Sequence, residues 1–482
     1  MNKLRVALVG AVGAALVATS SAAAFTPSNA YYAKQWYLGQ DKAFDAWVDP
    51  PTLDPVKVAI VDSGVECSLP DFAGRIAKSK SFVGGSPCID NQGHGTIVAG
   101  EIAGALNAAG VVGLAYSSQL LVAKVVAPDG TIPLKAEAAG IRWAVNQGAR
   151  VVNLSFGAVR DPQDPTLDSF SKAEAKAVDY AVKKGAVVVA AVGNSDEAYT
   201  TPWPYASWPS ALPHVIGVGA LTRSGKVPDF SDQDPVFVDI AAPGVGIFST
   251  FPKELTAAQS GCTPQGYTDC ASGDYRHPVG TSFAAPQVSA AAAVLLGLDS
   301  SLTSSQVTRI LERHTDDVNA VTGCDECPTG RDKFSGWGSL DVEKAVNFLS
   351  SGNSMPPSDR LEPNDSARQA GNSKLWGKRP GVSATLDAWD DPRDVYRVRL
   401  VRGQRVDVRA VARWSNAAVG LTLWRPGTKV LHGRKWLVAR SRRPWKTQHV
   451  SYRAAHTGWY DVQLRIARNG GGRYTLHVTK RG

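Results

Sequence analysis

The first two thirds of the chain alternate between short apolar runs rich in β-branched residues and longer amphipathic segments. The apolar runs, which predict buried strands, lie at 56–62, 119–126, 149–157, 186–194 and 214–221. The amphipathic segments, which predict helices, lie at 94–106, 134–148 and 171–185. Strands that are apolar on both faces are typical of parallel sheets covered by helices. The pattern therefore predicts an α/β domain with a mostly parallel sheet flanked by helices.

A different pattern follows, in which apolar and polar residues alternate one by one. Such segments lie at 394–401, 404–412, 418–426, 458–467 and 473–480. Alternation with a period of two predicts strands with one buried face, so we expect a small all-β antiparallel sandwich. The Gly-rich stretch 468–472 predicts a hairpin turn between the last two strands. Residues 350–360 predict a linker, which places a first domain at 25–349 and the sandwich at 361–482.

The first 24 residues have the composition of a secretory signal peptide. Lys3 and Arg5 precede an apolar run of 13 residues, and three alanines at 22–24 offer a cleavage site. The run is shorter than the roughly 20 residues of a membrane-spanning helix. Because no later stretch is both long and apolar enough to span a membrane, we expect a secreted protein without a transmembrane segment.

Export changes the interpretation of the six cysteines, because disulfides persist in oxidising compartments. Six cysteines allow 15 pairings. Proximity along the chain favours Cys67–Cys88, Cys262–Cys270 and Cys324–Cys327. A zinc or redox site at 324–327 is the alternative, but neither a second CxxC motif nor a thioredoxin-like context accompanies it.

Charge and tryptophan content separate the two predicted domains. From residue 350 onward, 26 Lys and Arg face 9 Asp and Glu, whereas the preceding residues carry a net charge of −8. The basic part also holds seven tryptophans, at positions 376, 389, 414, 424, 436, 445 and 459. We expect most of these rings to fill the sandwich core. The excess positive charge, with Arg, Lys and Trp interleaved over 433–446, also fits contact with an anionic polymer.

Four polar residues stand where an α/β sheet places its ligands, at the carboxyl ends of strands or at the start of helices. Asp62 ends the first strand, His94 begins a helix, Asn194 ends a later strand, and Ser282 opens an apolar helix-like stretch. Taken singly, each is more simply explained as a turn or cap residue. Together and in this order they offer a serine nucleophile, a histidine base, a carboxylate to orient that base and an amide donor for an oxyanion.

These motifs resemble those of the subtilisin-like serine proteases, and of the thermitase branch in particular, over residues 31–348. The resemblance implies that Ser282 is the nucleophile, His94 the general base, Asp62 the orienting carboxylate and Asn194 the oxyanion donor. It also implies a set of substrate-binding residues, namely Ser155, Phe156, Gly157, Ala191, Gly193 and Ser207. Ser207 would lie at the base of the S1 pocket, where a small residue leaves room for a bulky apolar or aromatic side chain. None of the aligned pocket residues supplies a buried acid that would select Lys or Arg.

The same resemblance implies that the chemistry needs no cofactor, and that Asp71 belongs to a structural calcium site. The partner loop 106–113 is about one residue shorter than in the family and lacks a second Asn. Many members carry a folding prodomain, for which the 37 residues between Phe25 and Asp62 leave no room. We expect a monomer that acts on protein or peptide substrates.

The basic domain resembles the β-sandwich domains of the pre-peptidase C-terminal type found in secreted bacterial proteases. The similarity rests on Glu362-Pro-Asn-Asp365, on Asp391 and Asp394-Val-Tyr, and on the Gly403-Gln404 turn. The alternative function is a catalytically silent protease relative that binds polyanions or cell walls through this domain. An α/β-hydrolase esterase does not fit, because such enzymes need a GxSxG elbow and the order Ser, Asp, His.

Overall fold

A computed structural model describes residues 24–482 except 196, 197, 199, 258–266, 268–277, 357, 358, 430, 432 and 469. The expected signal peptide and the expected Cys262–Cys270 pair lie outside the described residues. Two further pairs that proximity favoured, Cys67–Cys88 and Cys324–Cys327, are disulfide-bonded.

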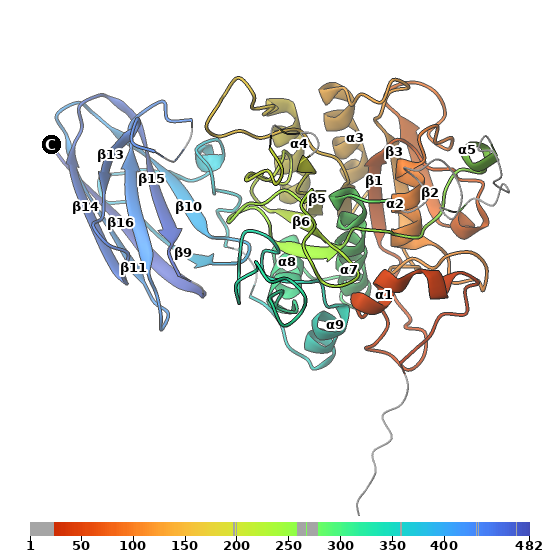
Figure 1. Cartoon of the computed structure of the whole chain (residues 1–482). Coiled ribbons are helices and arrows are strands. Elements are labelled where there is room, and N and C mark those ends of the chain that lie inside the picture. The colour runs from red at the N-terminus through yellow and green to blue at the C-terminus, as the bar shows by residue number, and fades with distance from the viewer. Residues whose placement is uncertain are drawn as a thin grey trace, which may run out of the picture.

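The first part of the chain is built on a seven-stranded sheet in the order β2-β3-β1-β4-β5-β6-β7, with every neighbouring pair parallel (Figure 1). Its strands are β1 (Lys57–Asp62), β2 (Ile76–Ser81), β3 (Gln119–Lys124), β4 (Val151–Leu154), β5 (Val187–Ala191), β6 (Val215–Leu221) and β7 (Ile240–Pro243). The prediction of a mostly parallel sheet is confirmed. The sequence pattern missed β2 because this edge strand is largely exposed and reads as polar.

Helices cover both faces of this sheet. The described residues hold the helices α1 (Trp36–Gln40), α2 (His94–Ala103), α3 (Leu134–Asn146), α4 (Lys172–Lys183), α5 (Lys253–Ala257), α7 (Ala285–Leu298), α8 (Ser304–Arg313) and α9 (Val342–Ser350), the short 3-10 turns η1 (Tyr32–Lys34), η2 (Pro70–Phe72) and η4 (Thr281–Phe283), and η5 (Gln369–Gly371) in the C-terminal part of the chain. One core packs α2 and α7 against the sheet, and a second core packs α3 and α4 against the opposite face. Successive residues of β1 point into different cores, which is why the strand is apolar throughout.

Local signals end the helices where the sequence predicts. Gly148 and Gly185, with φ of 89° and 84°, follow α3 and α4, in the left-handed conformation that a glycine adopts without steric conflict. Ser171 caps α4 by accepting a hydrogen bond from the backbone of Glu174.

One helical stretch of the described chain, Thr281–Leu298, is long and apolar enough to cross a membrane by length and composition, with a mean hydropathy of 1.4. The sequence analysis did not identify this stretch as long and apolar enough to span a membrane. In the structure 89% of this stretch is buried, because α7 lies in the protein core, where it packs against α2 and against β4 and β5 of the sheet.

The basic C-terminal part forms two packed sheets, in the orders β13-β12-β15-β10-β8 and β14-β11-β16-β9. The strands are β8 (Lys374–Leu375), β9 (Gly381–Asp387), β10 (Arg393–Leu400), β11 (Arg405–Ala412), β12 (Val419–Trp424), β13 (Leu437–Arg440), β14 (Thr447–Arg453), β15 (Gly458–Ile466) and β16 (Gly471–Arg481). All pairs are antiparallel except the two-residue strand β8, which runs parallel to β10. Figure 1 shows this sandwich beside α4, β6 and α8.

Two expectations for the sandwich were wrong. The segment that follows β15 passes from one sheet to the other, so β15 and β16 do not form a hairpin. Among the seven tryptophans only Trp424 is buried, while Trp376 and Trp445 are each 66% exposed. The core instead consists of small and branched aliphatic residues together with tyrosines such as Tyr396 and Tyr474, because the one-by-one alternation places those residues inward.

Candidate active site

The residues predicted to carry chemistry come from separate elements at one end of the parallel sheet. Asp62 is the last residue of β1, and His94 is the first residue of α2. Asn194 lies three residues beyond β5, and Ser282 lies in the turn η4 that leads into α7. The carboxyl edge of the sheet thus collects residues that are up to 220 positions apart in sequence.

Asp62 and His94 form a direct hydrogen-bonded pair. The Nδ1 atom of His94 lies 2.8 and 3.0 Å from the two carboxylate oxygens of Asp62. Because an ionised carboxylate can only accept, Nδ1 carries the proton and Nε2 of the neutral ring is left as the basic atom. The Asp62 side chain is 2% exposed and the His94 ring is 28% exposed, so the base reaches solvent while its partner does not.

Glycines allow this pair to form. A Cβ atom on Gly95 would lie 2.2 Å from the carbonyl oxygen of Gly64 and 3.0 Å from Cβ of Asp62. Gly64 itself has a φ of 105°. The start of α2 can therefore approach the loop after β1 only when no side chain stands at position 95.

Two residues that the sequence reasoning missed hold this region together. Asp90 accepts hydrogen bonds from the backbone of Gly93 and from both the backbone and the hydroxyl of Thr96, which ties the first turn of α2 to the preceding loop. Lys124, beside Asp62 in the β1–β3 register, donates to the carbonyl oxygens of Ser63 and Ile89 at 2.6 and 2.9 Å. Neither an Asp in a loop nor a Lys at the end of a strand carries a distinctive spacing, so only the fold reveals these contacts.

Two effects of the surroundings change the pKa of His94 in opposite directions. Burial of the ring lowers the pKa of His94, whereas the negative charge of Asp62 and its hydrogen bond raise it. The net result is a pKa of His94 above the ordinary value of 6.5. The ring therefore binds a proton readily, as a base must, and Asp62 stabilises the protonated form.

The amide of Asn194 is oriented by Thr281, a further residue that sequence reasoning did not single out. The backbone N–H and the hydroxyl of Thr281 both lie within hydrogen-bonding distance of Oδ1 of Asn194, at 3.0 and 3.1 Å. The backbone N–H of Gly193 donates to the same hydroxyl at 3.3 Å. Because Oδ1 accepts from a backbone donor, the amide cannot be reversed, and its NH2 group points away from Thr281.

Ser282 is not a helix cap in this structure. The N-cap residues of η4 and α7 are Gly280 and Ala284. Ser282 is partly exposed between two buried neighbours, Thr281 and Phe283. The ring of Phe283 lies 5.3 Å from the ring of His94, centre to centre, which brings the turn that carries Ser282 beside the base.

The predicted substrate-binding residues lie on segments that meet at Ser207. Ala158 and Trp208 exchange backbone hydrogen bonds of 2.8 and 2.9 Å, which joins the segment after β4 to the segment that carries Ser207. A Cβ on Gly157 would lie 3.0 Å from Cβ of Ser207, and a Cβ on Gly193 would lie 2.2 Å from its hydroxyl oxygen. The Ser207 side chain therefore stands between Gly157 and Gly193.

The other predicted substrate-binding residues lie at or just beyond the carboxyl ends of β4 and β5. Ser155 is buried, and its hydroxyl accepts a hydrogen bond from the amide of Asn153 at 2.8 Å. Phe156, between Ser155 and Gly157, is half-buried. Ala191 is the last residue of β5 and leads directly into the segment with Gly193.

Asp71 is buried, and both of its carboxylate oxygens accept hydrogen bonds. Oδ1 accepts from the backbone of Val111 at 2.8 Å, and Oδ2 accepts from the hydroxyl of Tyr267 at 3.0 Å. In the adjoining loop, the carbonyl oxygens of Ala105, Ala109 and Val111 all face the side-chain nitrogen of Asn29. The loop thus presents several carbonyl oxygen atoms, and oxygen atoms are the ligands that calcium prefers. A calcium ion at Asp71 stays a prediction.

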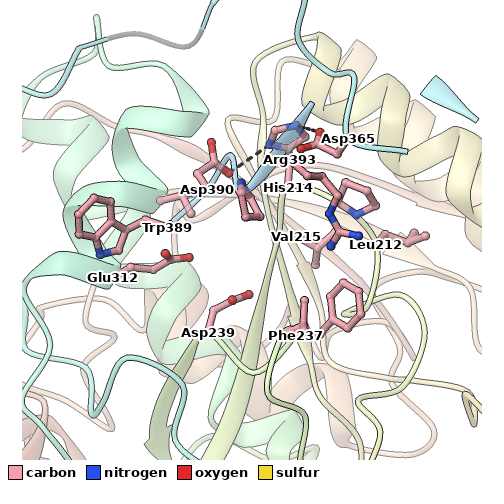
Figure 2. A pocket seen from close by; sticks show the side chains of 14 residues that line it. Leu212, His214, Val215, Phe237, Asp239, Glu312, Asp365, Trp389, Asp390 and Arg393 are labelled. Carbon is pink, nitrogen blue, oxygen red and sulfur yellow. Dashed lines mark hydrogen bonds and ion pairs between the residues drawn. The ribbon is translucent and has the colours of Figure 1, made fainter. Parts of the chain in front are cut away.

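A second group of titratable residues joins the two parts of the chain. Figure 2 shows a pocket between them, lined by His214 and Phe237 on one side and by Asp365, Asp390 and Arg393 on the other. His214 contacts Asp365 through Nε2 at 2.8 Å and Asp390 through Nδ1 at 3.1 Å. Burial lowers the pKa of His214, but these two carboxylates raise it well above the ordinary value. Glu362 lies 3.4 Å from the same Nε2 atom, so three acids of the sandwich contact His214.

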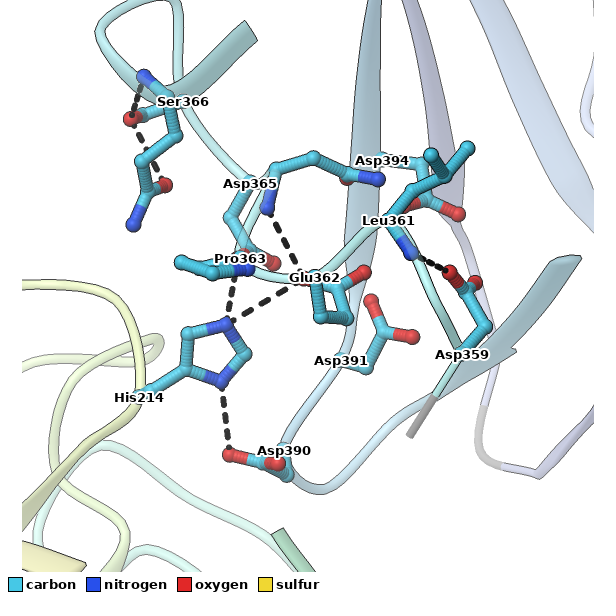
Figure 3. A network of polar contacts seen from close by, with 12 residues as sticks. His214, Asp359, Leu361, Glu362, Pro363, Asp365, Ser366, Asp390, Asp391 and Asp394 are labelled. Atoms are coloured by element: carbon cyan, nitrogen blue, oxygen red, sulfur yellow. Dashed lines mark hydrogen bonds and ion pairs between the residues drawn. The ribbon is translucent and has the colours of Figure 1, made fainter. Parts of the chain in front are cut away.

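Next to His214 lies a cluster of four carboxylates, from Asp359, Glu362, Asp391 and Asp394 (Figure 3). One oxygen from each lies within 4.8 Å of the others. Oε1 of Glu362, Oδ1 of Asp391 and Oδ1 of Asp394 are buried without a hydrogen-bond partner. Burial and the neighbouring acids raise the pKa of Asp391 and of Asp394 well above the ordinary value.

The parallel sheet with Asp62, His94, Asn194 and Ser282 at one edge is the arrangement of a subtilisin-like serine peptidase. The model of the subtilase family matches residues 54–338. The chain belongs to this family of serine endopeptidases. A crystal structure of a lanthipeptide protease covers 68% of this chain and 99% of its own, with a TM-score of 0.54 and 22% identity, and it supports the fold.

Named relatives agree over the same region. Thermitase of Thermoactinomyces vulgaris is 35% identical over 240 residues, which cover 49% of this chain and 80% of thermitase. A thermophilic serine proteinase of Bacillus sp. (strain AK1) is 33% identical over 276 residues, or 57% of this chain and 60% of that protein. Subtilisin E of Bacillus subtilis (strain 168) is 36% identical over 259 residues, or 53% of this chain and 59% of that protein. The chain thus spans about three fifths of the length of the last two.

The charge of Asp62 sets the first prediction. Replacing Asp62 by Asn removes the negative charge that raises the pKa of His94, so we expect this pKa to fall and the acid limb of any His94-dependent activity to move to lower pH. The rate on the plateau should fall by about 10⁴-fold, because Asn also favours the wrong tautomer of the histidine. NMR titration of His94 and the pH profile of kcat/KM measure the two effects.

The exposed residue Asp129 provides the matched control for this substitution. Asp129→Asn should leave both the titration of His94 and the profile unchanged. An acid limb that stays in place, or that moves to higher pH, in Asp62→Asn would show that Asp62 does not raise the pKa of His94.

Proposed function

We propose that the chain is a secreted serine endopeptidase that hydrolyses peptide bonds through an acyl-enzyme formed on Ser282. The observation that carries this proposal is the hydrogen bond between the buried Asp62 and the partly exposed His94, whose ring lies beside the turn that bears Ser282. Secretion is supported by the signal-like N-terminal sequence and by the disulfides, which are typical of oxidising compartments.

In the proposed reaction, Nε2 of His94 removes the proton from Oγ of Ser282 as this oxygen attacks the scissile carbonyl carbon. Asp62 stabilises the imidazolium that forms. His94 then returns the proton to the leaving amine nitrogen as the carbon–nitrogen bond breaks, which leaves an ester on Ser282. Water, deprotonated by the same nitrogen, hydrolyses this ester and restores the enzyme.

The NH2 group of Asn194 is the proposed donor to the oxyanion, together with the backbone N–H of Ser282. Its orientation is supported by the two groups of Thr281 that hold Oδ1. A donor fixed before the reaction needs no reorganisation when charge develops on the carbonyl oxygen, which is the main source of such stabilisation. The segment 155–157 would pair with the extended substrate, and the residues around Ser207 would receive the side chain that precedes the scissile bond.

The decisive variant is Ser282→Ala. We expect casein hydrolysis to fall by about 10⁶-fold, as it does when subtilisin loses its nucleophile, with an unchanged melting temperature. A serine-directed phosphonate should label the unaltered chain and Ser301→Ala, an exposed serine control, but not Ser282→Ala. A folded chain that neither hydrolyses casein nor takes the label would support the alternative of a catalytically silent protease relative.

A structural calcium ion is part of the proposal, although the chemistry requires none. Asp359, Glu362, Asp391 and Asp394 are the residues that would hold it, because buried carboxylate oxygens without partners fit a hard divalent cation and are costly without one. Bound there, the ion would stabilise the fold next to the contact between the two parts of the chain.

Calcium should raise the melting temperature, and EDTA should lower it. At 100 times Kd the free energy of unfolding should increase by about 2.7 kcal/mol. Asp391→Asn should reduce this increase yet raise the melting temperature in EDTA, because a neutral amide relieves the crowding of buried carboxylates that raises the pKa of Asp391 and Asp394. The same comparison on Asp71→Asn measures any part of the calcium-dependent increase in melting temperature that depends on Asp71. Asp129→Asn is the control. Equal melting temperatures in calcium and EDTA would exclude a calcium site in either place.

Contact with an anionic polymer is a second proposed property, carried by one face of the sandwich. On the outer side of the sheet β14-β11-β16, register neighbours bring together the exposed residues Arg405, Arg409, His449, Arg453, Arg473, His477 and Arg481. Asp407 lies among them and contacts Arg405, His449 and Arg481. Such a surface attracts phosphate or sulfate groups and loses affinity with salt.

The double variant Arg405→Glu, Arg409→Glu tests this surface. Binding of a 20-base-pair DNA duplex to the full chain should weaken, and the slope of log K against log salt should decrease by about 2, since each removed phosphate contact changes it by about 1. Lys172→Glu, on α4, carries a single exposed charge change away from this face and should have little effect. Failure of the unaltered chain to bind at 50 mM salt would contradict the proposal.

A further inference from the structure

The pocket between the two parts of the chain is lined by charged groups that no step of the proposed reaction uses. The volume open to the centre of a water-sized sphere is about 50 Å³, and the pocket is open to solvent rather than fully enclosed. One water needs roughly 10–15 Å³ measured in this way, so the space takes about three to five water-sized groups. Leu212, Val215 and Phe237 form apolar parts of the lining (Figure 2). The space thus suits a very small polar molecule.

A buried acid without a hydrogen-bond partner lines this pocket on the peptidase side. Glu312, in α8, is 2% exposed, and its Oε2 atom has no partner among the described residues. Burial and the charges of Asp239 and Asp390 raise the pKa of Glu312 well above the ordinary value. The charge of Arg331 lowers this pKa, but Arg331 itself pairs with Asp239 at 3.3 Å. A carboxyl group in such a position is stabilised by a positive charge that enters the pocket.

A cation without an ion pair lines the same pocket on the sandwich side. Arg393 is the first residue of β10, and no carboxylate of the described chain forms an ion pair with it. Its guanidinium carbon lies 6.0 Å from the centre of the Phe237 ring. Burial lowers the pKa of Arg393, whereas the charge of Asp365 raises it. Figure 2 shows the guanidinium group and the carboxylate of Glu312 on opposite sides of the pocket, so a small molecule between them meets one charge of each sign.

We propose that this pocket binds a free α-amino acid of the smallest size, glycine or alanine, as a zwitterion. The carboxylate of the ligand pairs with the guanidinium group of Arg393, and its ammonium group lies against Glu312, where Asp239 and Asp390 add negative charge. One ligand then supplies a charged partner to both groups, which a simple cation or a simple anion cannot do. Because Arg393 belongs to the sandwich and Glu312 to the peptidase domain, the ligand links the two parts of the chain. The site does not depend on the reaction proposed at Ser282.

Calorimetric titration of the full chain carrying Ser282→Ala, in buffer with calcium, tests the proposal without cleavage of the chain by itself. We expect glycine and alanine to bind with a Kd between about 10 μM and 10 mM, a range that a ligand of this size can reach. N-acetylglycine lacks the ammonium charge and glycinamide lacks the carboxylate, so each should bind at least about tenfold more weakly than glycine. Equal binding of glycine and either analogue would reveal a site for a single charge and overturn the proposal.

Two variants in the same background locate the site. Arg393→Gln and Glu312→Gln should each weaken glycine binding by about tenfold or more, because each removes one charged partner. Arg465→Gln, at the exposed register neighbour of Arg393 on β15, and Glu326→Gln, at an exposed acid, are the matched controls and should leave the Kd unchanged. Loss of binding in only one of the two variants, in neither of them, or equally in the controls would overturn the proposal.

A further variant covers the case in which loss of a charge at the contact prevents folding. Val236 lines the pocket and is 46% exposed, so Val236→Trp should leave the fold intact, keep both charges and fill the space. Glycine should raise the melting temperature of the Ser282→Ala chain but not that of the chain that also carries Val236→Trp. Binding that survives this change, or no binding of glycine and alanine to the Ser282→Ala chain, would overturn the proposal. Because every readout is binding, an unaltered chain that is inactive on casein contradicts only the proposed function.

Discussion

The hydrogen bond between the buried carboxylate of Asp62 and the ring of His94 is the interaction on which the remaining site depends. It selects the tautomer of the ring, and its charge raises the proton affinity of His94 against the effect of burial. The pair exists because α2 begins almost in contact with the loop after β1, and a glycine at position 95 permits that approach. The packing of one helix against one strand end therefore sets the chemistry of the base.

Thr281 performs a comparable task for the second half of the site. Its hydroxyl and backbone N–H connect the start of the buried helix region to Gly193 and Asn194 beyond β5. The same short stretch thus orients the proposed oxyanion donor and positions the neighbouring Ser282. Since Gly193 also makes room for the Ser207 side chain, one segment of backbone connects the proposed reacting groups with the site proposed for the substrate side chain.

The sandwich is joined to the peptidase domain by charges of opposite sign that are withdrawn from water. His214 enters an acidic region formed by Asp365 and Asp390, and Arg309 pairs with Asp387 at 3.2 Å. The basic part of the chain therefore places most of its acids at the contact and at the four-carboxylate cluster, and it presents a row of arginines on the outer sheet. That division explains how a part of the chain with a large positive net charge can dock against an acidic one while keeping a basic free face.

The sequence by itself determined the parallel α/β architecture and the glycine ends of α3 and α4, because these follow from periodicity and local signals, and its resemblance to the subtilisin-like proteases made Asp62, His94, Asn194 and Ser282 the candidates for the reaction. It could not identify β2, the change of sheet after β15, or the incomplete burial of most tryptophans, because edge exposure and sheet pairing depend on distant neighbours. Only the tertiary structure revealed the contacts of Asp90, Lys124 and Thr281. Each of these acts through a hydrogen bond or a close approach across separate segments, and residue type and spacing do not encode such a contact.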